Sequence, residues 1–218
     1  MYPGGNRTSK HDVSVIFNVT VDYAKHTNFE YDAILGVKPG KDTAFDKLVS
    51  VYDKNDQYLL LVPAMINDDT SKAKAFLGEE PSNVCGEFNL VDSNSNVWTN
   101  DYVRKVHNVN ITFKVTPSFD SHFIVSSKGI SLLGDHLITK KQYRNLRKFN
   151  VSYGGVDLEI NPQDAYKHIT QYYGLDAFVH DDCGFDLGLP NHVFEKHCIK
   201  MAKDGKKYKI GLAERKQG

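Results

Sequence analysis

The sequence predicts an α+β fold that is mostly β, with an antiparallel β-sandwich core and flanking helices. Two observations support this prediction. Several segments are rich in β-branched residues with apolar side chains at alternate positions, most clearly residues 13–21 and 106–115. In addition, the strand patterns do not alternate regularly with helical patterns, so a parallel, doubly wound sheet is not expected.

The individual elements follow from periodicity and from turn residues. In chain order, strands are expected at 13–21, 29–37, 57–66, 83–91, 106–115, 122–126 and 207–212. A cluster of turn residues at 92–96 predicts a hairpin between Val91 and Val97. Helices are expected at 41–53, 135–148, 165–173 and 191–203. The third helix follows a start signal at Asn161 and Pro162 and stops at Gly174.

The chain shows no internal repeat and no low-complexity linker that would mark a domain boundary. Its 218 residues suit one large domain or two small ones. We therefore expect a short polar N-terminal arm at residues 1–11 and a single compact domain at residues 12–218.

Charge is balanced, with 27 lysines and arginines against 27 aspartates and glutamates. Tight binding of nucleic acid needs a basic face, so the balance argues against a specific nucleic-acid partner. A net charge near zero also favours association between copies, because nothing repels them.

Three features predict a cytoplasm as the location. The N-terminal residues are polar and lack the apolar core of a signal peptide. No apolar run approaches the roughly 18 to 20 residues that cross a bilayer, so no membrane partner is expected. The three cysteines, Cys85, Cys183 and Cys198, are widely spaced, which predicts no disulfide framework and a reducing compartment.

Polar residues gather at 180–183, together with His192, His197 and Cys198. Metal ligands would need short paired spacing, and these residues do not lie on one face of a helix. We therefore expect a polar turn and a solvated helix face, with no catalytic set, no metal site and no required cofactor. The turn at 126–129 could hold a phosphate, but its residue types are common in turns.

Tyrosine and lysine are the distinctive residues, with 12 tyrosines and 22 lysines against 5 arginines. Tyrosine gives large, rigid contact area with a polar tip, which suits interfaces, although these rings could equally belong to an ordinary core. Both side chains lose protons at roughly pH 10 to 10.4, so alkali removes positive and adds negative charge together. Repulsion would then destabilise a close-packed array. The candidate alkali-sensing or interface residues are Tyr166, Tyr172, Tyr173, Tyr143, Tyr153 and Tyr208.

Several short segments fall in a recognisable order. The central ones are Val109-Asn110-Ile111-Thr112-Phe113, Thr116-Pro117-Ser118-Phe119, Ile124, Lys128-Gly129 and Asp135-His136-Leu137. Flanking ones lie at 12–15, 29–31, 43–48, 161–162, 176–178 and 208–213. Together they resemble the cypovirus polyhedrins, which form the crystalline occlusion bodies of cytoplasmic insect reoviruses.

This resemblance implies a structural protein and not an enzyme. It implies homotrimers that pack into a cubic lattice around virus particles, protect the virions and dissolve in an alkaline gut. It also makes bound nucleotides possible, although no residue of this chain matches a nucleotide contact. The chain departs from the family at its start, where about eleven polar residues replace a longer segment whose helix reaches neighbouring trimers.

Two alternative functions remain open from the sequence. One is another viral capsid-associated or matrix protein, which would form a discrete oligomer. The other is a Cys–His hydrolase with Cys183 or Cys198 as the nucleophile.

Overall fold

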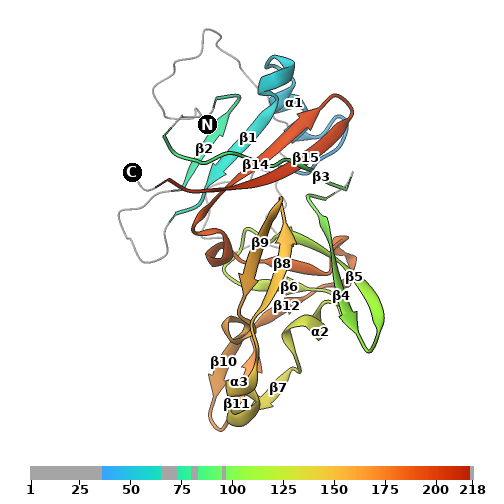
Figure 1. Ribbon diagram of the computed structural model, residues 1–218, viewed down its shortest axis with the longest axis vertical. Helices are drawn as coiled ribbons and strands as arrows, with labels where there is room; N and C mark the ends of the chain where they lie inside the picture. Colours follow the sequence, from blue (N-terminus) through green and yellow to red (C-terminus); the bar gives the residue numbers. More distant parts are fainter. Residues whose placement is uncertain (1–35, 65–72, 80–82, 95–96, 217–218) are drawn as a thin grey trace, which may run out of the picture.

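A computed structural model describes residues 36–64, 73–79, 83–94 and 97–216 (Figure 1). The described chain is mostly β with few helices, and most of its strand pairs are antiparallel, which confirms the predicted fold class. Two ladders are parallel, β12 with β6 and β13 with β5.

The upper part of Figure 1 holds a five-stranded sheet in the order β2-β1-β14-β15-β3. Its strands are β1 (Tyr58–Val62), β2 (Lys74–Leu77), β3 (Val91–Asp92), β14 (His197–Asp204) and β15 (Lys207–Glu214). Helix α1 (Ala44–Val49) lies beside this sheet and begins at Thr43, whose hydroxyl accepts a hydrogen bond from the Asp46 amide. A short 3-10 turn, η1 (Lys54–Asp56), leads into β1.

A second five-stranded sheet lies below the first, in the order β12-β6-β13-β5-β4. Its strands are β4 (Asn100–Val106), β5 (Val109–Pro117), β6 (Phe123–Val125), β12 (Ala177–Val179) and β13 (Leu187–Leu189). His107 and Asn108 join β4 to β5 with φ angles of 47° and 64°, as a two-residue turn with positive φ at both positions requires.

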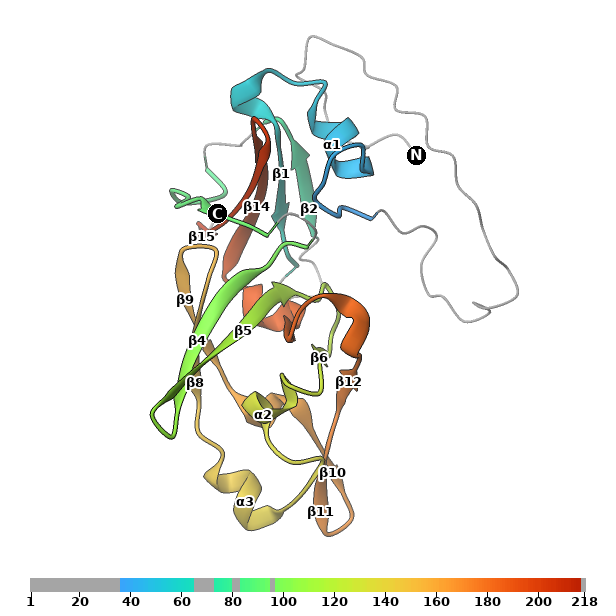
Figure 2. The same cartoon turned by 90° about the vertical axis from the view of Figure 1, so that its right-hand side faces the viewer.

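Two small sheets and short helices complete the lower part (Figures 1 and 2). They are the hairpin β8 (Phe149–Tyr153) with β9 (Val156–Ile160), and the sheet β10-β11-β7, formed by Tyr166–Ile169, Tyr172–Leu175 and Leu137–Thr139. The remaining helical elements are α2 (Ile130–Leu133), α3 (Lys140–Asn145), η2 (Pro162–Ala165), η3 (Asp181–Cys183) and η4 (Asn191–Phe194). No described helix is long and apolar enough to cross a membrane.

The core connects the two large sheets. One cluster of buried side chains includes Phe45 of α1 and Met201 of β14 together with Phe113 of β5 and Leu187 of β13. A smaller cluster lies on the upper sheet and contains a disulfide between Cys85 and Cys198.

Several predicted elements are confirmed and others are wrong. Strands at 57–66, 122–126 and 207–212 correspond to β1, β6 and β15, and 106–115 is mostly β5. The helix at 41–53 is present only as α1, and 135–148 contains β7 before α3. Strand 13–21 and most of 29–37 lie outside the described residues.

The helices predicted at 165–173 and 191–203 are wrong. The first range forms the hairpin of β10 and β11 after the short turn η2, and the second forms η4 and β14. The strand predicted at 83–91 is also wrong, because only Val91 belongs to a strand and Cys85 makes an isolated bridge to Arg215. The hairpin predicted across 92–96 is wrong because β3 pairs with β15.

Candidate alkali-sensitive tyrosine cluster

Tyr208 lies in a compact cluster with Asp46 and Lys203. The antiparallel register of β14 and β15 places Lys203 directly opposite Tyr208, so both side chains leave the sheet on the same face. Asp46, in the first turn of α1, meets them there. Its Oδ1 accepts from the Tyr208 hydroxyl at 3.1 Å and lies 2.7 Å from Lys203 Nζ. One carboxylate therefore ties α1 to the β14–β15 hairpin.

The cluster holds the Tyr208 phenol neutral. Burial first, and then the hydrogen bond and negative charge of Asp46, raise the pKa of Tyr208 to about 12. Although burial alone would raise the pKa of Asp46, hydrogen bonds from Lys203, the Asp42 amide and Tyr208 outweigh it and hold that pKa below its ordinary value. Ionising Tyr208 would place a second negative charge against an existing carboxylate.

Tyr153 is the most deeply buried of the candidate tyrosines, with 1% of its surface exposed. Its hydroxyl donates to the Trp98 carbonyl oxygen at 2.8 Å, which satisfies the buried polar group. Burial raises the pKa of Tyr153 well above its usual value. Ionising this phenol is therefore disfavoured in the folded chain.

Tyr143, Tyr166 and Tyr173 form an aromatic group at the lower end of the molecule. The rings of Tyr143 and Tyr173 stack with centroids 3.9 Å apart, and Tyr166 meets Tyr143 edge to face at 6.4 Å. The Tyr166 hydroxyl donates to the Asp135 carbonyl oxygen at 2.7 Å beside Gly134, where a Cβ would lie 2.7 Å from it. Burial, and then the Asp135 charge, raise the pKa of Tyr166 to about 12.

Tyr172 is exposed, with 44% of its surface accessible. It stands opposite Ile169 in the β10–β11 register, and Ile169 reaches across Gly174, which pairs with Leu137 of β7. Leu137 and Ile169 are also more than half exposed. Leu137, Ile169 and Tyr172 therefore form an apolar outer face on the sheet β10-β11-β7, which we call the outer apolar face.

The six tyrosines named from the sequence thus lie in different parts of the structure. Tyr143, Tyr166 and Tyr173 come together, Tyr172 lies on the opposite face of the same sheet, and Tyr153 and Tyr208 are separate core positions. Sequence reasoning missed Asp46 and Lys203, because Asp46 lies 162 residues from Tyr208 and no local pattern connects them.

The polar residues at 180–183 form hydrogen bonds with one another. His180 Nδ1 accepts from the Asp182 amide, and Cys183 Sγ donates to the His180 carbonyl oxygen at 3.1 Å. His192 Nε2 lies 3.6 Å from Asp164. Among the described residues, no group of histidine, cysteine and carboxylate side chains could hold a metal ion.

The turn at 126–129 is occupied by its own ion pairs. Lys128 Nζ lies 3.0 Å from Asp186, and Ser127 donates to Asp181 through both its amide and its hydroxyl. Lys128 and Ser127, the groups that would bind a phosphate, are therefore engaged with carboxylates.

The structure corrects the expectation for the cysteines, because Cys85 and Cys198 form a disulfide. Cys198 consequently has no thiol to act as a nucleophile, which removes one of the two candidate residues for a Cys–His hydrolase. His197, next to it, is half-buried, and burial lowers its pKa. Cys183 is free and half-buried.

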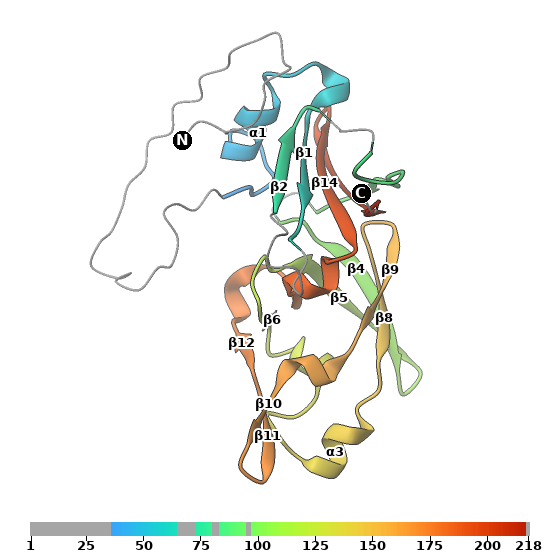
Figure 3. The ribbon, with the colours of Figure 1, turned by 90° about the vertical axis from the view of Figure 1, so that its left-hand side faces the viewer.

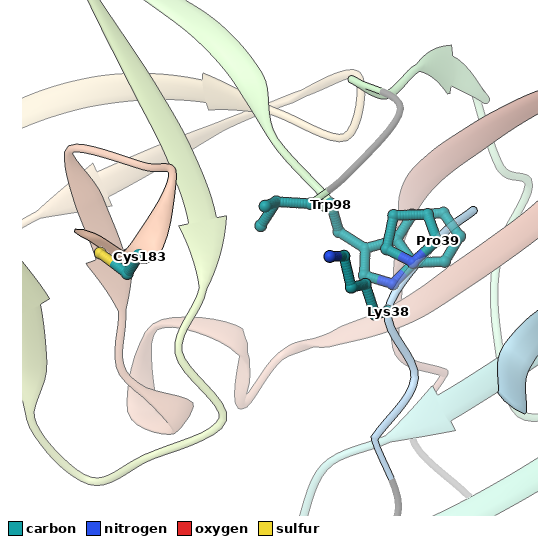
Figure 4. A pocket seen from close by; sticks show the side chains of 5 residues that line it. Lys38, Pro39, Trp98 and Cys183 are labelled. Atoms are coloured by element: carbon teal, nitrogen blue, oxygen red, sulfur yellow. The ribbon is translucent and has the colours of Figure 1, made fainter. Parts of the chain in front are cut away.

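A hollow of about 260 Å³ lies between the two large sheets and is lined by Lys38, Pro39, Val97, Trp98 and Cys183 (Figure 4). Trp98 fixes one wall by donating its Nε1–H to the Val37 carbonyl oxygen at 2.6 Å. In Figure 4 the Cys183 side chain lies across the hollow from Lys38 and Pro39.

No protein-family model matches this chain, and no curated protein matches it at a significant level of similarity.

Proposed function

We propose that this chain is a structural protein of a viral occlusion body. Copies of it would assemble into crystals in the host cell cytoplasm, embed and protect virions, and release them in alkali. The observation that carries this proposal is the cluster of Asp46, Lys203 and Tyr208, which is neutral as a whole at pH 7 and becomes negative when the phenol ionises. Such a cluster couples the fold to strongly alkaline pH.

Association of copies has a separate basis on the surface. Leu137, Ile169 and Tyr172 expose apolar surface side by side, on a chain whose formal net charge at pH 7 is zero. Exposed apolar patches mark contact sites, and a neutral chain adds no long-range repulsion. The outer apolar face is therefore our candidate for a contact between copies. The homotrimer, the cubic lattice and any bound nucleotide rest on the resemblance to cypovirus polyhedrins.

The disulfide bears on the proposed compartment. A cytoplasm keeps thiols reduced, and persistent disulfides are rare there. The proposal therefore expects Cys85 and Cys198 to be reduced in freshly made protein and oxidised only after crystals leave the cell. Trapping of free thiols in crystals taken directly from lysed cells distinguishes the two states.

The test is expression of the full chain alone in cultured cells, followed by electron microscopy. We expect dense crystals that stay intact at pH 7 and release soluble protein between about pH 10 and pH 12, the range over which exposed and buried phenols ionise. Crystals of Tyr208→Phe should need a higher pH to dissolve than those of Tyr143→Phe, whose ring lies away from Asp46.

Two results would contradict the proposal. Crystals that survive pH 12 would remove the alkaline trigger. Expression that yields only a discrete soluble oligomer on size exclusion would favour the capsid-associated or matrix alternative, which the outer apolar face also fits.

A further inference from the structure

Strand β12 is an open edge of the lower five-stranded sheet. Among the residues that the structure describes, it pairs with β6 alone and ends the strand order, and Figures 2 and 3 show it at the margin of the molecule. The His180 amide donates to Val125 of β6. Because successive residues of a strand point their backbone groups in opposite directions, the N–H and C=O of Val179 face away from β6.

This edge is unusually apolar. Phe178 and Val179 are 55% and 48% exposed, and the third residue of the strand is Ala177. Proteins usually block an open edge with charged side chains. Among the described edge strands, β2, β3, β4 and β10 carry such a charge, at Lys74, Asp92, Lys105 and Lys167, whereas β7 and β8 carry none. Strand β12 has no such charge and is a ready template for another strand.

The sequence contains an apolar segment with a strand-like pattern outside the described residues. Residues 13–21 place valine or phenylalanine at every second position, which is the pattern of a strand with one buried face. They carry no charged residue. A segment of this kind needs a partner edge, because an isolated strand buries nothing.

The path of the chain brings this segment within reach of β12. The described chain begins at Gly36, and Val37 is anchored to Trp98. Lys38 lines the same hollow as Cys183, which lies four residues after Val179. The 14 intervening residues, 22–35, can extend to roughly 45 to 50 Å, whereas three strand residues cover about 10 Å.

We propose that residues 13–21 of the same chain add to the open edge of β12 as a further strand. The short tether gives the segment an effective concentration in the millimolar range, which favours its own β12 over that of another copy. The added strand covers Phe178 and Val179 and satisfies the outward backbone groups of β12. This edge is then closed to contacts between copies. The inference stands independently of the proposed function.

Amide hydrogen exchange of the chain at pH 7, at low and increasing concentration, tests the proposal. The Val179 amide should exchange slowly, like the His180 amide that β6 already protects. Deleting residues 1–21 should speed exchange at Val179 by roughly a hundredfold and leave His180 protected. Phe17→Asp should act in the same direction, whereas Asn18→Asp, with the same new charge on the opposite face of the segment, should have a much smaller effect.

Three results would overturn the proposal. These are fast exchange at Val179 in the full chain, slow exchange that survives the deletion, and protection that disappears on dilution. The last would mean that a second copy covers the edge. Because His180 reports whether the sheet itself is intact, a variant that fails to fold is recognised by loss of protection at both amides.

Discussion

Asp46 shows how one residue can make a fold sensitive to alkali. At neutral pH its carboxylate accepts from a phenol and pairs with an ammonium group, so every charge is compensated. The side chains of Asp46 and Lys203 are only 13% and 20% exposed, so water screens them little. When the phenol loses its proton, a hydrogen-bond donor becomes a second anion at about 3 Å.

Replacing Tyr208 with phenylalanine should remove this sensitivity. The pKa of Tyr208 is about 12 in the folded chain and near 10 in the unfolded chain. The contribution of Tyr208 to the free energy of unfolding is therefore fully present below pH 10 and is lost as the pH rises to 12. The wild-type chain should lose about 2 kcal/mol from this residue across that window. Tyr208→Phe should lose about 1 kcal/mol at pH 7, from the missing hydrogen bond, and should decline less above pH 10.

Denaturant unfolding at pH 7, 10 and 12 measures both effects. Tyr143→Phe is the matched control, because it also removes one phenol but leaves Asp46 and Lys203 in place. Equal decline of the two variants between pH 10 and 12 would show that the cluster has no special part in alkaline destabilisation.

At the scale of elements, the sequence predicted β1, β5, β6 and β15 but missed β4, β8 and β9, whose burial alternates, and β14, which is buried on both faces. Strand β14 is the central strand of the upper sheet and is covered on both faces, so Cys198, Ile199, Met201 and Ala202 form two buried pairs that mimic helical spacing. The start signal at Pro162 is real but produces only the single turn η2. Tyr166, Tyr172 and Tyr173, which follow it, lie in the β10–β11 hairpin.

The disulfide fastens an irregular segment to that central strand. It joins residues 113 positions apart, and apart from the bridge at Cys85 the described residues 83–90 belong to no strand. Closing a loop of this length restricts the unfolded chain strongly. Cys85→Ala with Cys198→Ala should therefore lower the free energy of unfolding by about 2 to 4 kcal/mol under oxidising conditions.

Chemical denaturation with and without a reductant checks the prediction. Adding reductant to the wild-type chain should give the same loss, and the double variant should not respond further. Cys183→Ala, which removes a free and half-buried thiol, serves as the control. A reductant that leaves wild-type stability unchanged would contradict a stabilising disulfide.

At the scale of the whole molecule, composition predicted a response to alkali but could not say which residues would carry it. Tyrosine and lysine content indicated alkali sensitivity, and the structure has Tyr153, Tyr166 and Tyr208 buried with raised pKa values. Their partners come from distant segments, so no reading of local sequence could find them. The outer apolar face was equally hidden, because Leu137 lies 32 residues before Ile169 and only the pairing of β7 with β11 brings the two onto one face.

A charge on the outer apolar face should block assembly and leave the fold intact. Ile169→Lys places an ammonium group between Leu137 and Tyr172, where a contact with another copy would have to desolvate it. Because Ile169 is 52% exposed, its loss should cost the fold less than about 1 kcal/mol.

Gln171→Lys adds the same charge in the turn of the same hairpin, beyond the face, and is the matched control. We expect crystals from Gln171→Lys and soluble, folded protein from Ile169→Lys, measured by microscopy, sedimentation and circular dichroism. Crystals of undiminished number from Ile169→Lys would show that copies meet through another surface.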